Sequence, residues 1–217
     1  MDNETILRHV DHTLLRPDAT WDQINELCRE AVLHRTASVC IPPCFVLKAK
    51  QTWPSLKIGT VIGFPLGYQT QAAKASEAWD ARQNGADELD MVINMTDVKS
   101  GNLGEVVAEI GAIRQLVQDK VLKVIVETCS LTHEEKIALC YCVARGGADY
   151  IKTSTGFGSA GACLEDVKLF KELMGDRLKI KAAGGIRTRE QMEAFLEAGC
   201  DRIGTSSAAI LWQEENK

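Results

Sequence analysis

Short aliphatic and β-branched runs alternate with longer amphipathic stretches along the chain. The short runs predict strands near residues 10–15, 37–41, 57–62, 88–93, 123–127, 150–152, 179–182 and 202–205. Between them, apolar positions at helical spacing predict crossover helices over 20–34, 71–84, 103–120, 132–145, 163–174 and 188–198. Eight strands separated by helices favour an α/β fold, a single (β/α)8 or TIM barrel, over an open doubly wound sheet.

The length and composition of the chain are compatible with one domain. It has 217 residues, of which 45% are hydrophobic and 25% charged, so it can bury a sizeable core. No Pro/Gly/Ser-rich linker or low-complexity tract interrupts it. We therefore expect one barrel domain over residues 1–217.

A weak internal repeat precedes three of the predicted strands, at residues 84–90, 146–152 and 198–204. In each copy a glycine is expected to end a helix in the left-handed conformation, and an aspartate two residues later opens the next strand. The residue three positions after that aspartate is Asp90, Lys152 or Gly204. If the three joints are equivalent, Asp90 and Lys152 point into one cavity at the carboxyl mouth of the barrel, where such enzymes place their chemistry.

Two lysines at the ends of neighbouring predicted strands indicate a nucleophilic amine. Lys152 ends strand six and Lys181 lies in strand seven, although a surface position is the ordinary interpretation of a single lysine. Carbonyl attack needs the neutral amine, and a like charge ~4 Å away disfavours the ammonium by roughly 4 kcal/mol, or about three pKa units, at an effective dielectric of ~20. Lys152 is our candidate nucleophile and Lys181 the charge that lowers its pKa, but spacing alone does not decide which lysine has which role.

Carboxylates at the ends of two other predicted strands are candidates for proton transfer. Asp90 is placed to move protons through water during imine chemistry, or to form an ion pair with one of the lysines, and both roles are compatible. Glu127 is a weaker candidate of the same kind.

Glycine-rich loops follow the last two predicted strands and indicate a phosphate site. Gly184 and Gly185 follow strand seven, and Gly204, Ser206 and Ser207 belong to the segment that ends strand eight. Glycines let backbone N–H groups approach an anion, and the apolar stretch 207–211 is expected to offer a helix N-terminus to it. Either loop alone is compatible with ordinary turns, but together they favour phosphate at the place where barrels commonly bind it.

Charge and composition exclude several other classes of protein. The net charge is −5 with scattered Lys and Arg, which argues against a nucleic-acid partner, and the charged N-terminus and the lack of a long apolar run predict a cytoplasmic protein without a membrane partner. The eight cysteines are dispersed and no histidine cluster occurs, so we expect reduced thiols and no metal site. Cys40 is expected to be a buried inert thiol and His12 an ordinary hydrogen-bonding side chain.

Several long motifs occur in order and resemble one enzyme family, the deoxyribose-phosphate aldolases, over nearly the whole chain. They are DHTLLRPDAT (11–20), VIGFPLG (61–67), ELDMVIN (88–94), YIKTSTGF (150–157) and KIKAAGGIR (179–187). The resemblance implies reversible cleavage of 2-deoxy-D-ribose 5-phosphate to D-glyceraldehyde 3-phosphate and acetaldehyde, in deoxyribonucleotide catabolism and carbohydrate degradation. It implies no metal or organic cofactor, small phosphorylated sugar and aldehyde ligands, and is compatible with a homo-oligomer.

The resemblance also assigns roles to residues. It places the Schiff base on Lys152 and proton transfer on Lys181 and Asp90. It implies phosphate contacts at Gly184, Gly185, Gly204, Ser206 and Ser207, with Thr155 and Gly156 as further contacts, and substrate hydroxyl contacts near Asp11 and Thr13. The chain departs from some relatives at Phe157, where they have a lysine, and in the strand-two segment 40–45.

Three alternatives stay open at this point. One is a phosphate-binding barrel isomerase that forms no covalent imine, and another is a metal-dependent aldolase. The third is a barrel that binds a phosphorylated ligand without catalysis. Borohydride trapping, chelation and a direct assay of acetaldehyde release distinguish them from a Schiff-base aldolase.

Overall fold

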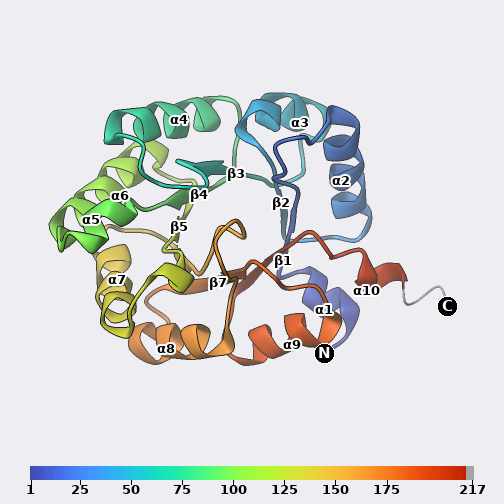
Figure 1. Ribbon diagram of the computed structural model, residues 1–217. Coiled ribbons are helices and arrows are strands. Elements are labelled where there is room, and N and C mark those ends of the chain that lie inside the picture. Colours follow the sequence, from blue (N-terminus) through green and yellow to red (C-terminus); the bar gives the residue numbers. More distant parts are fainter. Residues whose placement is uncertain (214–217) are drawn as a thin grey trace.

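The computed structural model describes residues 1–213 and shows a closed barrel of eight parallel strands surrounded by helices (Figure 1). The strands are β1 (Val10–Thr13), β2 (Ser38–Cys40), β3 (Ile58–Ile62), β4 (Glu88–Val92), β5 (Val121–Ile125), β6 (Tyr150–Lys152), β7 (Lys179–Ala183) and β8 (Arg202–Thr205). Each strand pairs with the next in sequence, and β8 closes the barrel on β1 with Asp11 opposite Gly204. This confirms the predicted (β/α)8 barrel.

The helices follow the strands in order around the barrel (Figure 1). They are α1 (Asn3–Leu7), α2 (Trp21–Leu33), α3 (Val46–Thr52), α4 (Gln71–Gln83), α5 (Met95–Lys99), α6 (Leu103–Val117), α7 (His133–Arg145), α8 (Leu164–Met174), α9 (Arg189–Glu197) and α10 (Ile210–Gln213), with short 3-10 turns η1 (Pro43–Phe45) and η2 (Thr128–Ser130). The six predicted helices are all present. Threonine capping boxes, such as Thr132 with Glu135, explain why three of them begin where they do.

The structure differs from the sequence prediction in four short helices and in the boundaries of β1 and β5. The helices α1, α3, α5 and α10 have four to seven residues, too few to show a helical period. Strand β5 begins two residues before the predicted segment 123–127, and Glu127 lies beyond it with a left-handed φ of 52° that ends the extended backbone. Strand β1 ends at Thr13, earlier than the predicted residue 15.

Strand alternation divides the side chains between an apolar shell and the barrel interior. In β4, Leu89 and Met91 belong to the hydrophobic core, whereas Glu88 and Asp90 join buried ion pairs with residues of other strands. Because successive side chains point to opposite faces, the charged residues of β4 are directed inward as a set. Within residues 1–213 no helix is long and apolar enough to cross a membrane.

A buried ion pair outside the barrel fastens the carboxyl end of β4 to two helices. Lys74 of α4 has no exposed surface, and its Nζ lies 2.8 Å from Oε1 of Glu109 on α6. The same ammonium donates a hydrogen bond of 2.9 Å to the carbonyl oxygen of Val92. Because one donor group contacts both helix and strand, it holds the end of β4 in place below the barrel mouth.

Candidate active site

Three equivalent joints lead into β4, β6 and β8 and set the height of the interior side chains. Their glycines follow helix ends with φ values of 97° at Gly85, 82° at Gly147 and 105° at Gly199. The aspartates that follow accept hydrogen bonds from backbone N–H groups of the strand before: Ile58 donates to Asp87 at 2.9 Å, Leu122 to Asp149 at 2.8 Å and Ile180 to Asp201 at 2.9 Å. These bonds fix the start of β4, β6 and β8 relative to the strand before each of them, as the internal repeat predicts.

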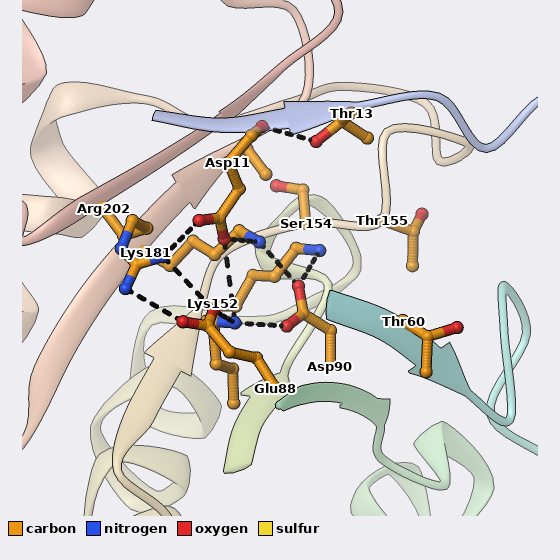
Figure 2. Close-up of polar contacts among 12 residues, drawn as sticks. Asp11, Thr13, Thr60, Glu88, Asp90, Lys152, Ser154, Thr155, Lys181 and Arg202 are labelled. Carbon is orange, nitrogen blue, oxygen red and sulfur yellow. Dashed lines mark hydrogen bonds and ion pairs between the residues drawn. The ribbon is translucent and has the colours of Figure 1, made fainter. Parts of the chain in front are cut away.

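The joints bring the two predicted amines to one carboxylate. Lys152 of β6 pairs in register with Lys181 of β7. The Nζ of Lys152 lies 2.8 Å, and that of Lys181 2.7 Å, from the same oxygen, Oδ2 of Asp90. Figure 2 shows the three side chains converging from different strands. The two lysine amines and the Asp90 carboxylate therefore lie close together, as predicted from the sequence.

Burial and neighbouring charges shift the pKa of the two amines in opposite directions. The pKa of Lys152 is lowered, first by burial and then by the adjacent Lys181 ammonium, although Asp90 acts against the shift. Burial also acts to lower the pKa of Lys181, but the carboxylates of Asp11 and Asp90 outweigh it, and its pKa is raised. The lowered pKa of Lys152 has the direction predicted from the sequence, but its main cause is desolvation and not the neighbouring charge.

A layer of charged residues below the two amines was not expected from the sequence. Lys123 of β5 contacts Glu88 and lies 2.9 Å from Oδ1 of Asp90. Arg202 of β8 contacts Asp11 and lies 3.2 Å from Glu88, and Lys181 contacts Asp11 from the other side (Figure 2). The signal in the sequence is a charged residue flanked by apolar ones inside a strand, as in Leu-Lys-Val at 122–124.

The amines lie next to a pocket of about 400 Å³ at the carboxyl mouth of the barrel. The pocket is lined by residues 13–16 after β1, Lys152 itself, residues 155–157 after β6, residues 183–187 after β7 and residues 204–206 of β8 and its loop. Thr13 lines this pocket, whereas Asp11 is fully buried in the charged layer below, so only Thr13 of the two expected hydroxyl-binding residues reaches the pocket wall.

Six of the seven candidate phosphate residues line the pocket. These are Thr155, Gly156, Gly184, Gly185, Gly204 and Ser206. Ser207 is not part of the lining; its N–H donates a hydrogen bond of 2.9 Å to the Thr205 hydroxyl. The helix expected over 207–211 begins only at Ile210, so the predicted helix N-terminus at Ser207 is wrong.

Glycine is required where the loops after β6 and β7 meet. A Cβ on Gly161 would lie 2.1 Å from the carbonyl oxygen of Gly184, a distance that backbone atoms cannot accommodate. Gly184 itself has a φ of 86°. The two backbones are therefore in close contact, and Gly184 and Gly185 line the pocket without side chains of their own.

Two arginines on the rim of the pocket were not predicted. Arg16 from the loop after β1 and Arg187 from the loop after β7 both belong to its lining. Their guanidinium groups offer the bidentate donors that suit a phosphate. Phe157, at the position where some relatives have a lysine, also lines the pocket but is half exposed and packs edge-on against Phe64. The two arginines therefore supply positive charge at the rim of this pocket.

Glu127, Cys40 and His12 do not line this pocket. Glu127 accepts hydrogen bonds from the backbone and hydroxyl of Thr155, so it braces one wall of the pocket. Cys40 is buried, and burial raises the pKa of its thiol to about 11, which keeps it neutral. His12 points away from the pocket, and its Nε2 lies 2.9 Å from Glu30 on α2.

Comparison with known proteins gives consistent results for the whole barrel. Residues 5–210 match the DeoC/LacD family of aldolases. The chain is 53% identical over 216 residues to the deoxyribose-phosphate aldolase of Clostridium botulinum (strain Alaska E43 / Type E3), which covers 99% of this chain and 98% of that relative.

Two solved structures are similar over nearly their full length. The aldolase QR15 has a TM-score of 0.94 at 38% identity and covers 97% of this chain and 96% of its own. The tetrameric deoxyribose phosphate aldolase of Aeropyrum pernix has a TM-score of 0.91 at 31% identity and covers 100% of this chain and 93% of its own. The similarity therefore extends over the strands and over the loops that form the pocket.

Proposed function

The chain belongs to the DeoC/LacD family of aldolases, and from this we propose that it reversibly cleaves 2-deoxy-D-ribose 5-phosphate to D-glyceraldehyde 3-phosphate and acetaldehyde through a Schiff base on Lys152. The observation that supports the residue assignment best is the position of its amine. Lys152 lines the pocket, is 3% exposed and has a lowered pKa, whereas Lys181 has no exposed surface and a raised pKa. Of the two, Lys152 is thus the amine that is both accessible and readily neutral.

The first half of the reaction forms the imine. The neutral amine of Lys152 attacks C1 of the open-chain sugar, and the carbinolamine loses water to give a protonated imine. Asp90 contacts this amine, and Lys181 contacts the same Asp90 oxygen, so these two residues supply and accept the protons of these steps. The positive imine nitrogen then withdraws electrons from the neighbouring carbons.

The second half breaks the carbon–carbon bond. Asp90 and Lys181 relay the proton of the C3 hydroxyl away from the sugar. The C2–C3 bond then breaks, and C3 becomes the aldehyde carbon of glyceraldehyde 3-phosphate. The electron pair of the broken bond forms the C1–C2 double bond of an enamine and neutralises the imine nitrogen. Protonation of C2 and hydrolysis then release acetaldehyde and restore the Lys152 amine.

The pocket fits the remainder of this substrate. Backbone groups of Gly184, Gly185 and Gly204 with Ser206 form one wall, and Arg16 and Arg187 add positive charge at the rim. We propose that these groups bind the 5-phosphate together with Thr155 and with Gly156, whose backbone lies beside Gly184. Because Ser207 lies outside the lining, we assign it an indirect role through the Thr205 hydroxyl.

Assembly with further copies of the chain and a cytoplasmic location stay predictions. The Aeropyrum pernix relative is tetrameric, which supports an oligomer here. Size-exclusion chromatography with light scattering measures the number of subunits directly.

Two measurements on the intact protein test the proposed function. Incubation with 2-deoxy-D-ribose 5-phosphate is expected to release acetaldehyde, detected by coupling to alcohol dehydrogenase and NADH. Borohydride added during turnover is expected to inactivate the protein and to leave a reduced adduct on the peptide that contains Lys152. Acetaldehyde release without any adduct, or an adduct on another lysine, would contradict the assignment.

Replacing the rim arginines is expected to weaken recognition of the phosphate. Arg187→Gln and Arg16→Gln should each raise KM for the phosphorylated sugar roughly 5- to 10-fold, since hydrogen bonds to charged groups are worth about 1.5–3 kcal/mol and these side chains are partly exposed. Activity toward unphosphorylated 2-deoxy-D-ribose is the control and should change little. An equal loss with both sugars would mean that the arginines shape the pocket and do not bind phosphate.

A further inference from the structure

Seven charged side chains fill the interior of the barrel, and their charges do not balance. Four are cations (Lys123, Lys152, Lys181 and Arg202), and three are carboxylates (Asp11, Glu88 and Asp90). All but Arg202, whose side chain is 11% exposed, are at most 3% exposed. With every group ionised, one positive charge is left over in a region where an uncompensated charge is costly.

The ion pairs show which cation is least compensated. Arg202 contacts both Asp11 and Glu88, and Lys181 contacts both Asp11 and Asp90. Lys123 lies within 4 Å of three carboxylates. Within residues 1–213, Lys152 forms an ion pair with Asp90 alone, and shares it with Lys123 and Lys181. Loss of the Lys152 proton is thus the change that removes the excess charge at the lowest electrostatic cost.

We propose that Glu88 and Arg202, which do not line the substrate pocket, are positioning residues that act through Lys152 by setting the charge balance that keeps its amine neutral. This rests on the proposed role of Lys152 as the Schiff-base residue. Glu88 and Arg202 lie 3.2 Å apart through two oxygen–nitrogen contacts, so each neutralises the other and the pair as a whole contributes no net charge. Removing one member alone therefore changes the charge of the interior by one unit.

Other groups face this interior and must be considered in the balance. The Cys40 thiol faces it from β2, and its pKa of about 11 keeps it neutral below that pH. The Tyr150 ring lies against Lys123 and Arg202 at 5.9 and 5.8 Å. Arg16 and Arg187 are on the pocket rim, open to solvent, where water and salt screen their charges. The direction in which a substitution at Glu88 or Arg202 changes the pKa of Lys152 is therefore set by the seven buried groups.

The two neutralising variants are expected to have opposite effects. Arg202→Gln leaves three cations with three carboxylates, so Lys152 retains its proton to a higher pH. Glu88→Gln leaves four cations with two carboxylates, so Lys152 loses its proton at a lower pH. Each shift should be roughly one pH unit, the size that one charge exerts across several ångströms at an effective dielectric of about 20. A purely structural role for either residue would not produce shifts of opposite sign.

The readout is the pH dependence of reductive alkylation at Lys152. Each protein is treated with acetaldehyde and sodium cyanoborohydride, the amine forms an imine with loss of water, and cyanoborohydride delivers hydride to give a secondary amine. The modified Lys152 peptide is quantified by mass spectrometry over a series of pH values. Arg202→Lys, which keeps the charge, is the matched control and should leave the pH of half-maximal labelling unchanged. The double variant E88Q/R202Q should return that pH to the wild-type value.

Each outcome of the experiment bears on the proposal. Opposite shifts that cancel in the double variant support it, and shifts in the same direction, or none in either variant, overturn it. If Arg202→Gln does not fold, Glu88→Gln alone decides by shifting the profile downward or leaving it in place. Failure of wild-type Lys152 to be labelled at any pH would instead refute the proposed Schiff-base function, so the two failures are distinguishable.

Discussion

Replacing Lys152 by methionine is expected to lower kcat for cleavage of 2-deoxy-D-ribose 5-phosphate by about 10⁶-fold, the scale on which enzymes lose activity without their covalent nucleophile. Methionine retains an unbranched chain of similar length but has no amine, so neither the carbinolamine nor the imine can form. The protein should still fold, because the lost group is the least compensated cation of the interior. Activity is measured by acetaldehyde release, and folding by circular dichroism.

Lys168→Met is the matched control for this variant. Lys168 is exposed on α8, so the same change in composition should leave kcat and KM unchanged. A Lys152→Met protein that is folded and retains more than about one per cent of wild-type kcat would show that cleavage does not depend on this amine. Lys181 would then be the next residue to test as nucleophile.

Replacing Asp90 by asparagine is expected to lower kcat by roughly 10²- to 10⁴-fold, the range for loss of a general acid or base. Burial acts to raise the pKa of Asp90, but Lys123, Lys152 and Lys181 outweigh it and hold that pKa well below its ordinary value, so the side chain is a carboxylate at neutral pH. The amide has the same shape but cannot relay a proton. Because the neighbouring negative charge is gone, Lys152 should lose its proton more readily than in the wild type.

This combination separates two roles of Asp90. We expect Asp90→Asn to be labelled on Lys152 by acetaldehyde and cyanoborohydride at least as fast as the wild type, while cleavage of the phosphorylated sugar is slow. Asp176→Asn, on an exposed side chain, is the control for the substitution and should behave as wild type. Near-normal cleavage by Asp90→Asn would mean that the carboxylate is an ion-pair partner only.

The fold could be predicted because each of its repeated units leaves a local signal. Apolar runs and helical periods identify all eight strands and the six long helices. The positive φ at Gly85, Gly147 and Gly199 follows from the internal repeat, since only glycine adopts that backbone at low cost. The short helices and the end of β5 were not predictable, because they depend on tertiary contacts and on the left-handed Glu127 rather than on a pattern of several turns.

The candidate site was predictable in part, and the limits have a physical origin. The repeat aligns Asp90 with Lys152, and neighbouring parallel strands align Lys152 with Lys181, so this contact follows from register. Lys123, Glu88 and Arg202 were overlooked because a charged residue within a strand is ordinarily assigned to solvent. The relative weight of burial and charge at Lys152 does not follow from the sequence either, because it depends on how many carboxylates surround each amine in the folded barrel.

The pairing of the first strand with the last has a consequence for protein synthesis. Asp11 emerges from the ribosome early and Arg202 among the last residues of the barrel, yet they contact each other when β8 closes on β1. An unfinished chain that lacks β8 has neither a sealed barrel nor a complete set of interior charges. The surroundings that hold the Lys152 amine are therefore complete only once the last strand has been synthesised and has closed on the first.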